Sequence, residues 1–242
     1  MSTKSRTITP ETLPATKTPT TIGIIMDGNR RWAIEHGLPK LEGHRRGLDK
    51  VREMLDWARE AGIKNVVVFA LSTENLKRTP EEVAYYYKLI RVAVRGFMSD
   101  FKKKGGVLHV AGDLSLLPKD TQEIIEKAQH DTAENSGLNF YMALAYGGRN
   151  ELVTAIKKIV AQNPKLEDIN DTLVAKNLLT YPMPDPDLII RTSGEQRLSG
   201  FLPWQSVYSE LFFTKTYWPA FSKKEFLGIL KEYETRERRM GR

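Results

Sequence analysis

Residues 24–33 (IIMDGNRRWA) carry the strongest chemical signal in this sequence. An apolar run stops at Asp27, and a Gly-Asn pair and two arginines, Arg30 and Arg31, follow at once. Such a run, ended by Gly and Asn, is typical of a buried strand that leads into a turn. A helix opening there would offer free N–H groups to an anion. Arginine adds fork-shaped donors that suit phosphate oxygens.

Asp27 does not suit direct phosphate binding, because like charges repel. It becomes useful if it holds Mg²⁺, which bridges a carboxylate to a phosphate, or if it accepts a proton. The segment therefore predicts a metal-assisted diphosphate site at the end of the first strand. The alternative is a strand, a turn and two solvated arginines without any chemistry.

Further blocks of the sequence carry a resemblance to one family. They are Gly43–Gly47 (GHRRG), Phe69–Asn75 (FALSTEN) with Arg78, residues 146–149 (YGGR), residues 187–199 and residues 204–210. Together with residues 24–33, and in the same order, they resemble the motifs of the cis-prenyltransferases of the undecaprenyl diphosphate synthase type. The resemblance covers residues 20–242.

The resemblance implies an Mg²⁺-dependent enzyme that condenses isopentenyl diphosphate in cis with an allylic diphosphate such as farnesyl diphosphate. Its product would be a Z-polyprenyl diphosphate, such as undecaprenyl diphosphate or a related carrier-lipid precursor. Asp27 and Asn75 would act in catalysis, and Asp27 would hold the metal with Glu210, which a second subunit could supply. The implied substrate-binding residues are Gly28, Asn29, Arg30, Arg31, Trp32, Lys40 and His44 at the allylic diphosphate, Ser72, Thr73, Glu74, Leu76 and Arg78 in a second loop, and Arg191, Arg197, Leu198 and Ser199 at isopentenyl diphosphate.

Some positions depart from the family pattern. Leu76 stands where many bacterial members have Trp, Leu71 where Phe is common, Ala145 where Asn is frequent and Lys40 where Arg is common. None of these changes removes an implied metal ligand, so we expect the class of reaction to be kept. Leu71, Leu76 and Ala145 leave the choice of primer and the product length open.

Size and charge agree with a small anionic ligand. The 242 residues fit a single α/β domain, and the net charge of +7 favours anionic partners. Many arginines stand beside Gly, Ser or Asn at expected strand ends, which suits small phosphorylated molecules. Nucleic acid more often meets a continuous basic face with exposed aromatic residues, so we expect no nucleic-acid partner.

Several other classes of site and location are excluded or disfavoured. The absence of cysteine excludes disulfides and thiolate zinc sites, and the four histidines lack metal-ligand spacing. We find neither the apolar core of a signal peptide nor a stretch long enough to span a bilayer. We therefore expect a cytoplasmic protein with at most a peripheral membrane contact during product release.

The chain divides into a flexible tail over residues 1–20 and a catalytic domain over 21–242. Strand-like runs alternate with helical patterns in that domain, which predicts a mostly parallel sheet of about six strands flanked by helices. The predicted strands are 22–26, 65–71, 107–111, 139–145, 187–191 and 210–213, and the predicted helices are 44–61, 80–103, 118–133, 148–162, 171–179 and a last one from Ser222 to about 239.

The helix at 80–103 has an apolar face that allows two interpretations. The face is either ordinary core packing or one wall of an apolar tunnel for a growing polyprenyl chain. The residues concerned are Val83, Tyr86, Tyr87, Ile90, Val94 and Phe97, and the tunnel interpretation adds Ala70, Leu71 and Leu144.

A homodimer is expected from the density of large apolar residues in one segment. These residues are Phe201, Leu202, Trp204, Val207, Tyr208, Leu211, Phe212 and Phe213. The ending Arg239–Gly241 (RMG) matches an R-x-G ending that reaches the neighbouring subunit's site in related enzymes, or is a frayed basic end. Two other functions stay open: a non-catalytic partner subunit, against which the intact motif residues weigh, and a basic nucleic-acid-binding domain.

Overall fold

The computed structural model describes residues 18–236, except for the side chains of residues 97 and 98. The sheet contains six strands in the order β3-β4-β2-β1-β5-β6, and every neighbouring pair is parallel. The predicted sheet is therefore confirmed, with each strand end within one residue of its prediction. The strands are β1 (Thr21–Ile25), β2 (Asn65–Ser72), β3 (Val107–Ala111), β4 (Asn139–Tyr146), β5 (Leu188–Arg191) and β6 (Glu210–Phe213).

The helices follow the predicted alternation, and a short extra helix comes soon after the first strand. They are α1 (Asn29–Glu35), α2 (Lys40–Glu60), α3 (Pro80–Lys103), α4 (Lys119–Thr132), α5 (Gly148–Gln162), α6 (Asp171–Asn177) and α7 (Lys223–Thr235). The hydroxyl groups of Thr79 and Ser222 accept hydrogen bonds from backbone N–H groups in the first turns of α3 and α7. Both side chains thus cap the N-terminus of their helix.

Helix α7 ends at Thr235, earlier than the predicted end near residue 239. Arg236 follows the helix with an extended backbone (φ −75°, ψ 131°). Its guanidinium pairs with Glu210 at 2.7 Å and lies over the ring of Phe212. The Arg239–Gly241 ending lies outside the described residues.

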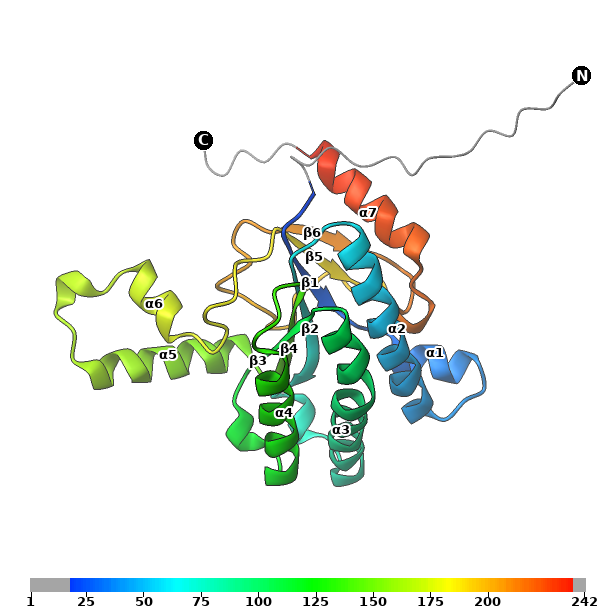
Figure 1. Ribbon diagram of the computed structural model, residues 1–242, viewed down its shortest axis with the longest axis horizontal. Coiled ribbons are helices and arrows are strands. Elements are labelled where there is room, and N and C mark those ends of the chain that lie inside the picture. The colour runs from blue at the N-terminus through cyan, green and yellow to red at the C-terminus, as the bar shows by residue number, and fades with distance from the viewer. Residues whose placement is uncertain (1–17, 237–242) are drawn as a thin grey trace, which may run out of the picture.

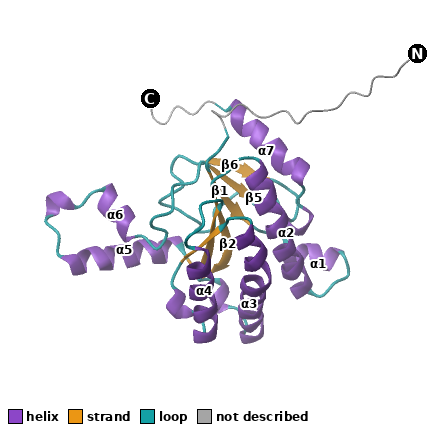
Figure 2. Ribbon diagram, viewed as in Figure 1, coloured by secondary structure: helices purple, strands orange, loops and turns teal. Residues whose placement is uncertain are grey.

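The two faces of the sheet are covered differently (Figure 1). Helices α2, α3, α4 and α7 pack on one face and bury alternate strand residues such as Ile24, Val68 and Met142. Non-helical segments around Met183, Phe201 and Leu202 cover the other face. Figure 2 shows these loops between the sheet and an arm formed by α5 and α6, which projects from the side of the molecule.

This packing corrects the predicted dimer surface. Phe201 and Leu202 are fully buried and Phe212 is nearly so, all within their own chain. Phe212 belongs to β6, and Phe201 and Leu202 cover the second face of the sheet. Loops cover this face because α5 and α6 project away from it. Val207 and Tyr208 from the same segment are exposed.

The backbone of Thr20, the last residue of the predicted N-terminal tail, is hydrogen-bonded to two parts of the domain. The backbone N–H of Thr20 donates to Asp187 Oδ2 at 2.7 Å, and its carbonyl accepts from the N–H groups of Lys64 and Asn65. Thr20 therefore belongs to the fold, whereas residues 1–17 lie outside the described part. Among residues 18–236, the helices are too short or too polar to cross a bilayer.

Candidate active site

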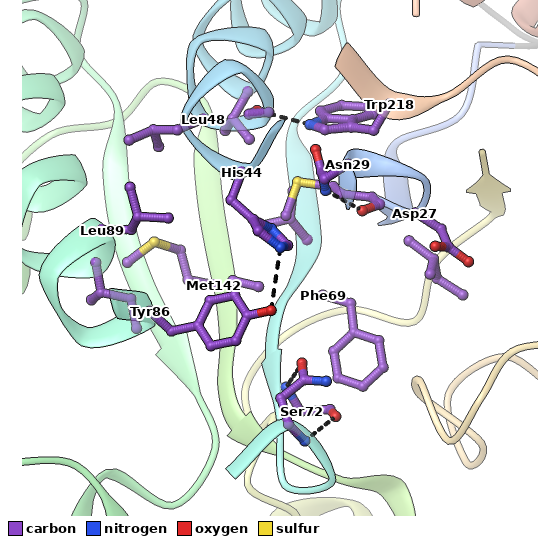
Figure 3. A pocket seen from close by; sticks show the side chains of 18 of the residues that line it. Asp27, Asn29, His44, Leu48, Phe69, Ser72, Tyr86, Leu89, Met142 and Trp218 are labelled. Atoms are coloured by element: carbon purple, nitrogen blue, oxygen red, sulfur yellow. Dashed lines mark hydrogen bonds between the residues drawn. The ribbon is translucent and has the colours of Figure 1, made fainter. Parts of the chain in front are cut away.

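A cavity of about 640 Å³ opens at the carboxyl ends of β1, β2 and β5. One end is lined by polar residues from these strand ends, which is where ligands bind in parallel sheets. The other end runs between the sheet and helices α2 and α3, and its walls are apolar apart from Arg52. In Figure 3, Asp27 and Asn29 lie on one side of His44, and Leu89 and Met142 lie on the other.

The predicted site residues that line this cavity come from four separate segments of the chain. They are Asp27, Gly28, Asn29, Arg30 and Arg31, then His44, then Ser72, Glu74, Asn75 and Arg78, and finally Arg191 and Ser199.

The turn after β1 needs glycine. Gly28 has φ +97°, and a Cβ atom there would lie 2.6 Å from the Tyr217 ring and 2.9 Å from Ser193. A Cβ on Gly43 would lie only 2.0 Å from the carbonyl oxygen of Asn29, so this glycine lets α2 approach the turn closely. The side chain of Asn29 donates to the Met26 carbonyl at 2.9 Å, which fixes the turn from within.

The carboxylate of Asp27 is the centre of the polar end. Its Oδ1 accepts from the Gly28 N–H at 2.7 Å and lies 3.4 Å from Nη2 of Arg31. Its Oδ2 accepts from Nη2 of Arg191 at 2.8 Å. Two positive side chains thus converge on one acid at the mouth of the cavity.

Arg191 is only 4% exposed although it is charged. Its Nη1 donates to Ser199 Oγ at 2.8 Å and to the carbonyl of Arg197. Its buried Nε has no hydrogen-bond partner within residues 18–236. A buried donor without a partner costs free energy. A bound anion could accept its hydrogen bond and remove that cost.

Glu195 has no predicted role, yet it joins two arginines of the site. Its carboxylate pairs with Nη1 of Arg31 at 3.2 Å and with Nη1 of Arg197 at 2.5 Å. These arginines, the hydrogen bond from Arg197 first, hold the pKa of Glu195 below its usual range. Arg31 also donates to Ser193 Oγ and lies against the Tyr217 ring. The only signal in the sequence is its position, because Glu195 lies inside the motif block of residues 187–199, between Arg191 and Arg197.

The second loop, after β2, is held by Ser72 and Asn75. Each caps the other: the Ser72 N–H donates to Asn75 Oδ1, and the Asn75 N–H donates to Ser72 Oγ, both at 3.2 Å. Because the amide oxygen of Asn75 is occupied, its NH₂ group is the part available to a substrate. Asn75 is thus suited to donate a hydrogen bond and to orient a substrate rather than to take a proton.

His44 lies where the polar end meets the apolar end. Burial, followed by the charges of Arg78 and Arg30, lowers its pKa to about 4. Its Nε2 lies 3.3 Å from the hydroxyl of Tyr86, which also accepts a hydrogen bond from Arg78. Arg30 pairs with Glu82 of α3 at 3.1 Å. Imidazole and two arginines are therefore held by the first turns of α3.

The apolar tunnel stays a prediction, and only some of its predicted residues line the apolar end of the cavity. Ala70, Ile90, Val94 and Leu144 line the cavity. The residues Val83, Tyr87 and Leu71 are absent from its lining, and the side chain of Phe97 lies outside the described part. The cavity is also lined by Arg52, Ala93 and Trp218, which have no predicted role in the site.

Some predicted binding residues lie beside the cavity rather than in it. Trp32 stacks on His36, and the Thr73 N–H donates to the Tyr146 carbonyl. The side chain of Arg197 is 60% exposed, on the outer side of the loop that holds Arg191. The predicted residues outside the lining are Trp32, Lys40, Thr73, Leu76, Arg197 and Leu198.

Glu210 lies far from Asp27 within one chain. Glu210 begins β6 and pairs in register with Leu188, the first residue of β5, whereas Asp27 lies just beyond the last residue of β1. Its carboxylate is paired with Arg236. The predicted Asp27–Glu210 metal pair therefore does not form within a single chain.

Asp27 fits a metal only as one ligand among several. Within the part of the chain that the structure describes, no group of three or more His, Asp or Glu side chains could hold an ion. Mg²⁺ commonly keeps several waters and binds through one or two carboxylates plus substrate phosphates. The donor set here suits Mg²⁺ that arrives with a diphosphate.

Comparisons with known proteins agree with this geometry. A family model described as putative undecaprenyl diphosphate synthase matches residues 25–241. A tritrans,polycis-undecaprenyl-diphosphate synthase (geranylgeranyl-diphosphate specific) of Thermoplasma volcanium is 45% identical over 93% of this chain and 89% of its own length. A (2Z,6E)-farnesyl diphosphate synthase of Thermobifida fusca is 44% identical over 92% of this chain and 90% of its own.

The fold is shared with a solved enzyme. The crystal structure of lavandulyl diphosphate synthase from Lavandula x intermedia, in complex with dimethylallyl diphosphate, superposes with a TM-score of 0.90 and 33% identity. The match covers 93% of this chain and 99% of that one.

Proposed function

The chain belongs to the undecaprenyl diphosphate synthase family of prenyltransferases, and from that premise we propose that it condenses isopentenyl diphosphate in cis with an allylic diphosphate to give a Z-polyprenyl diphosphate. One observation carries the proposal: a single cavity joins an arginine-rich end around Asp27 to an apolar end between the sheet and α3. A molecule with a diphosphate head and a hydrocarbon tail matches both ends. The alternative of a non-catalytic subunit finds no support, because the relatives are named as synthases.

The charges at the polar end suit two diphosphates in one site. Two diphosphates repel each other, and the arginines of the polar end oppose that repulsion. The Gly28 turn with Arg30 and Arg31 would bind the allylic diphosphate. Arg191 with Ser199 would bind isopentenyl diphosphate, with Arg197 at the outer side of that loop.

The reaction breaks the allylic C–O bond, and the electron pair leaves with the diphosphate. We propose that Arg30 and Arg31 stabilise that developing charge, because such preorganised donors are a large source of rate acceleration. Asp27 would hold Mg²⁺, whose positive charge would neutralise part of the same negative charge. The alkene of isopentenyl diphosphate then forms the new C–C bond.

A proton must leave the condensed product. The amide oxygen of Asn75 is occupied by Ser72, so two acceptors remain: Asp27 and a phosphate oxygen of the substrate. We propose that Asn75 orients isopentenyl diphosphate through its NH₂ group while one of these oxygens takes the proton.

The growing hydrocarbon chain would enter the apolar end of the cavity. Leaving it in water costs roughly 0.8 kcal/mol per CH₂. Ile90, Ala93 and Val94 of α3 and Phe140 and Leu144 of β4 line this volume, so these side chains would limit how far the chain can extend.

We propose further that the active unit is a homodimer. Val153, Ile156 and Val160 follow one stripe of α5, and the last two are 59% and 70% exposed. Val207 and Tyr208 add to the exposed apolar surface, and Gln205 ties their segment to Glu151 at the start of α5. Such a surface is covered economically by a second copy. A second copy is also the source from which Glu210 could reach a metal at Asp27.

A panel of primers tests the proposed reaction. The purified protein is incubated with labelled isopentenyl diphosphate, Mg²⁺ and dimethylallyl, geranyl, farnesyl or geranylgeranyl diphosphate in turn. We expect label in an extractable polyprenyl product with at least one primer, and none when either substrate is left out or when EDTA is added. A protein that incorporates no label with any primer would contradict the proposal.

A further inference from the structure

Helix α3 carries three consecutive tyrosines that have different surroundings. The hydroxyl of Tyr85 donates to the Leu41 carbonyl at 3.1 Å, and that of Tyr87 donates to the Leu116 carbonyl at 3.4 Å. Of the three, Tyr86 alone lines the cavity. Its side chain is nearly buried, so its hydroxyl must find partners inside the site.

Those partners are His44 and Arg78, two predicted substrate-binding residues that line the same cavity. Arg78 donates a hydrogen bond to the Tyr86 hydroxyl, and its guanidinium also lies over the Tyr86 ring, 5.6 Å from the centroid. The same hydroxyl lies 3.3 Å from Nε2 of His44, with the two rings edge to face at 5.0 Å. Figure 3 shows the contact between Tyr86 and His44 in the middle of the cavity.

The chemistry of the three groups fixes the direction of these hydrogen bonds. A guanidinium can only donate, so the Tyr86 oxygen accepts from Arg78 and its own proton remains to be donated. Burial raises the pKa of Tyr86, so that proton is present at neutral pH. Burial first, and then the charges of Arg78 and Arg30, lower the pKa of His44 well below neutral, against the opposing charge of Glu82. The Nε2 atom of His44 therefore has a lone pair to accept the proton of Tyr86.

We propose that Tyr86 is a positioning residue that holds Arg78 and His44 in place for the diphosphate. It does so through two hydrogen bonds in series, one donated by Arg78 to Tyr86 and one donated by Tyr86 to His44. These two hydrogen bonds keep the His44 ring neutral, with its proton on Nδ1, so that Nδ1 can donate. They also connect Arg78, from the loop after β2, and His44, from α2, to one residue of α3. This inference rests on the proposed function for the identity of the ligand, but its geometry is independent of the reaction.

Glu82 extends the same arrangement by one turn. It precedes Tyr86 by four residues, so both lie on the same face of α3. Glu82 pairs with Arg30 at 3.1 Å, while Tyr86 holds Arg78. The N-terminal turns of α3 therefore hold arginines from two separate segments of the predicted site, Arg30 after β1 and Arg78 after β2.

Replacing Tyr86 by Phe separates the contribution of the hydroxyl group from that of the aromatic ring. The variant Tyr86→Phe keeps the wall of the cavity and removes both hydrogen bonds. The matched control is Tyr85→Phe, which removes a tyrosine hydroxyl and one hydrogen bond from the neighbouring position of the same helix. Thermal unfolding followed by circular dichroism verifies that both variants fold.

Binding of inorganic diphosphate, measured by calorimetry, is the first readout. We expect the Kd to rise about tenfold or more in Tyr86→Phe, as for a lost hydrogen bond to a charged group, and to stay unchanged in Tyr85→Phe. In a background of Arg78→Ala, adding Tyr86→Phe should raise the Kd much less, because the two residues act through one contact. Equal Kd values for the two tyrosine variants would overturn the proposal.

The titration of His44, followed by NMR, is the second readout. Loss of a hydrogen bond to the neutral ring favours the protonated form, so the pKa of His44 should rise in Tyr86→Phe and not in Tyr85→Phe. An unchanged His44 titration in Tyr86→Phe would also overturn the proposal. If the wild-type protein fails to condense prenyl substrates while Tyr86→Phe still loses diphosphate affinity, the positioning role stands and the proposed function falls.

Discussion

The Asp27 carboxylate and the Arg191 guanidinium form an ion pair of 2.8 Å between the ends of the neighbouring strands β1 and β5. Arg191 is buried, while the side chain of Asp27 is 30% exposed and lines the cavity. The acid thus satisfies a buried charge on one side and faces incoming substrate on the other. A diphosphate that brings Mg²⁺ to Asp27 would meet a carboxylate already held in place.

Replacing Asp27 by Asn tests the role of its charge. Asn keeps the size of the side chain and one oxygen for the Gly28 N–H, but it is a poor metal ligand and a poor base. We expect kcat to fall ~10³-fold, the order seen when a key electrostatic group is removed, with the fold retained by circular dichroism. Asp49→Asn on the surface of α2 is the control. Turnover of Asp27→Asn close to that of the control would count against Asp27 as the catalytic centre.

Filling the apolar end should shorten the product. Ala93 lines the cavity on α3, whereas its neighbour Val92 points to solvent and is 49% exposed. Ala93→Leu should therefore shift the product distribution towards shorter chains, while Val92→Leu should leave it unchanged. Thin-layer or mass-spectrometric sizing of labelled products measures the shift. If both variants give the wild-type distribution, the hydrocarbon chain does not occupy this volume.

His44 should make stability depend on pH in the mildly acidic range. Its pKa is lowered from 6.5 to about 4 in the folded protein, so between these values the unfolded chain binds a proton that the folded chain does not. Stability is therefore full above pH 6.5 and falls as the pH drops towards 4, by at most about 3 kcal/mol. Urea unfolding of the wild type and of His44→Gln at about pH 4.5 and 7 measures the difference. If both proteins lose the same free energy of unfolding between about pH 7 and pH 4.5, His44 does not contribute to the pH dependence of stability.

The arm formed by α5 and α6 offers a test of the homodimer. Ile156→Asp places a charge in the middle of its exposed apolar stripe and should convert a dimer to a monomer in sedimentation velocity at micromolar concentration. Leu227→Asp, at an exposed apolar position on α7, is the control and should leave the mass unchanged. A wild-type protein that sediments as a fully active monomer would contradict the dimer.

The sequence predicts the sheet well, because its strands are apolar runs ended by turn residues and because strands and helices alternate. Parallel strands put their carboxyl ends at one edge, so the strand pattern alone predicts that Asp27, Ser72 and Arg191 lie near one another. Glu210 shows the limit of such reasoning, because it begins the predicted strand 210–213 and its distance from Asp27 depends on the direction of that strand. Since β6 runs parallel to β5, Glu210 lies at the opposite edge of the sheet from Asp27.

Side-chain partners were beyond prediction for physical reasons. The helical period places Tyr86 on an apolar face, but the period does not show that its hydroxyl meets Arg78 and His44. Nor does the density of apolar groups around Phe201 tell whether they face a second copy or their own sheet. That depends on α5 and α6 projecting away from the sheet, which only the tertiary structure reveals.

The stereochemistry of the product is the most direct test of the proposed cis condensation. The protein is incubated with its best allylic primer, ¹³C-labelled isopentenyl diphosphate and Mg²⁺, and the double bonds of the purified product are assigned by NMR. We predict that every isoprene unit added by the protein has the Z configuration and that Asp27→Asn forms almost no such product. A product whose added units are E, or a wild-type protein that forms none, would contradict the proposed reaction.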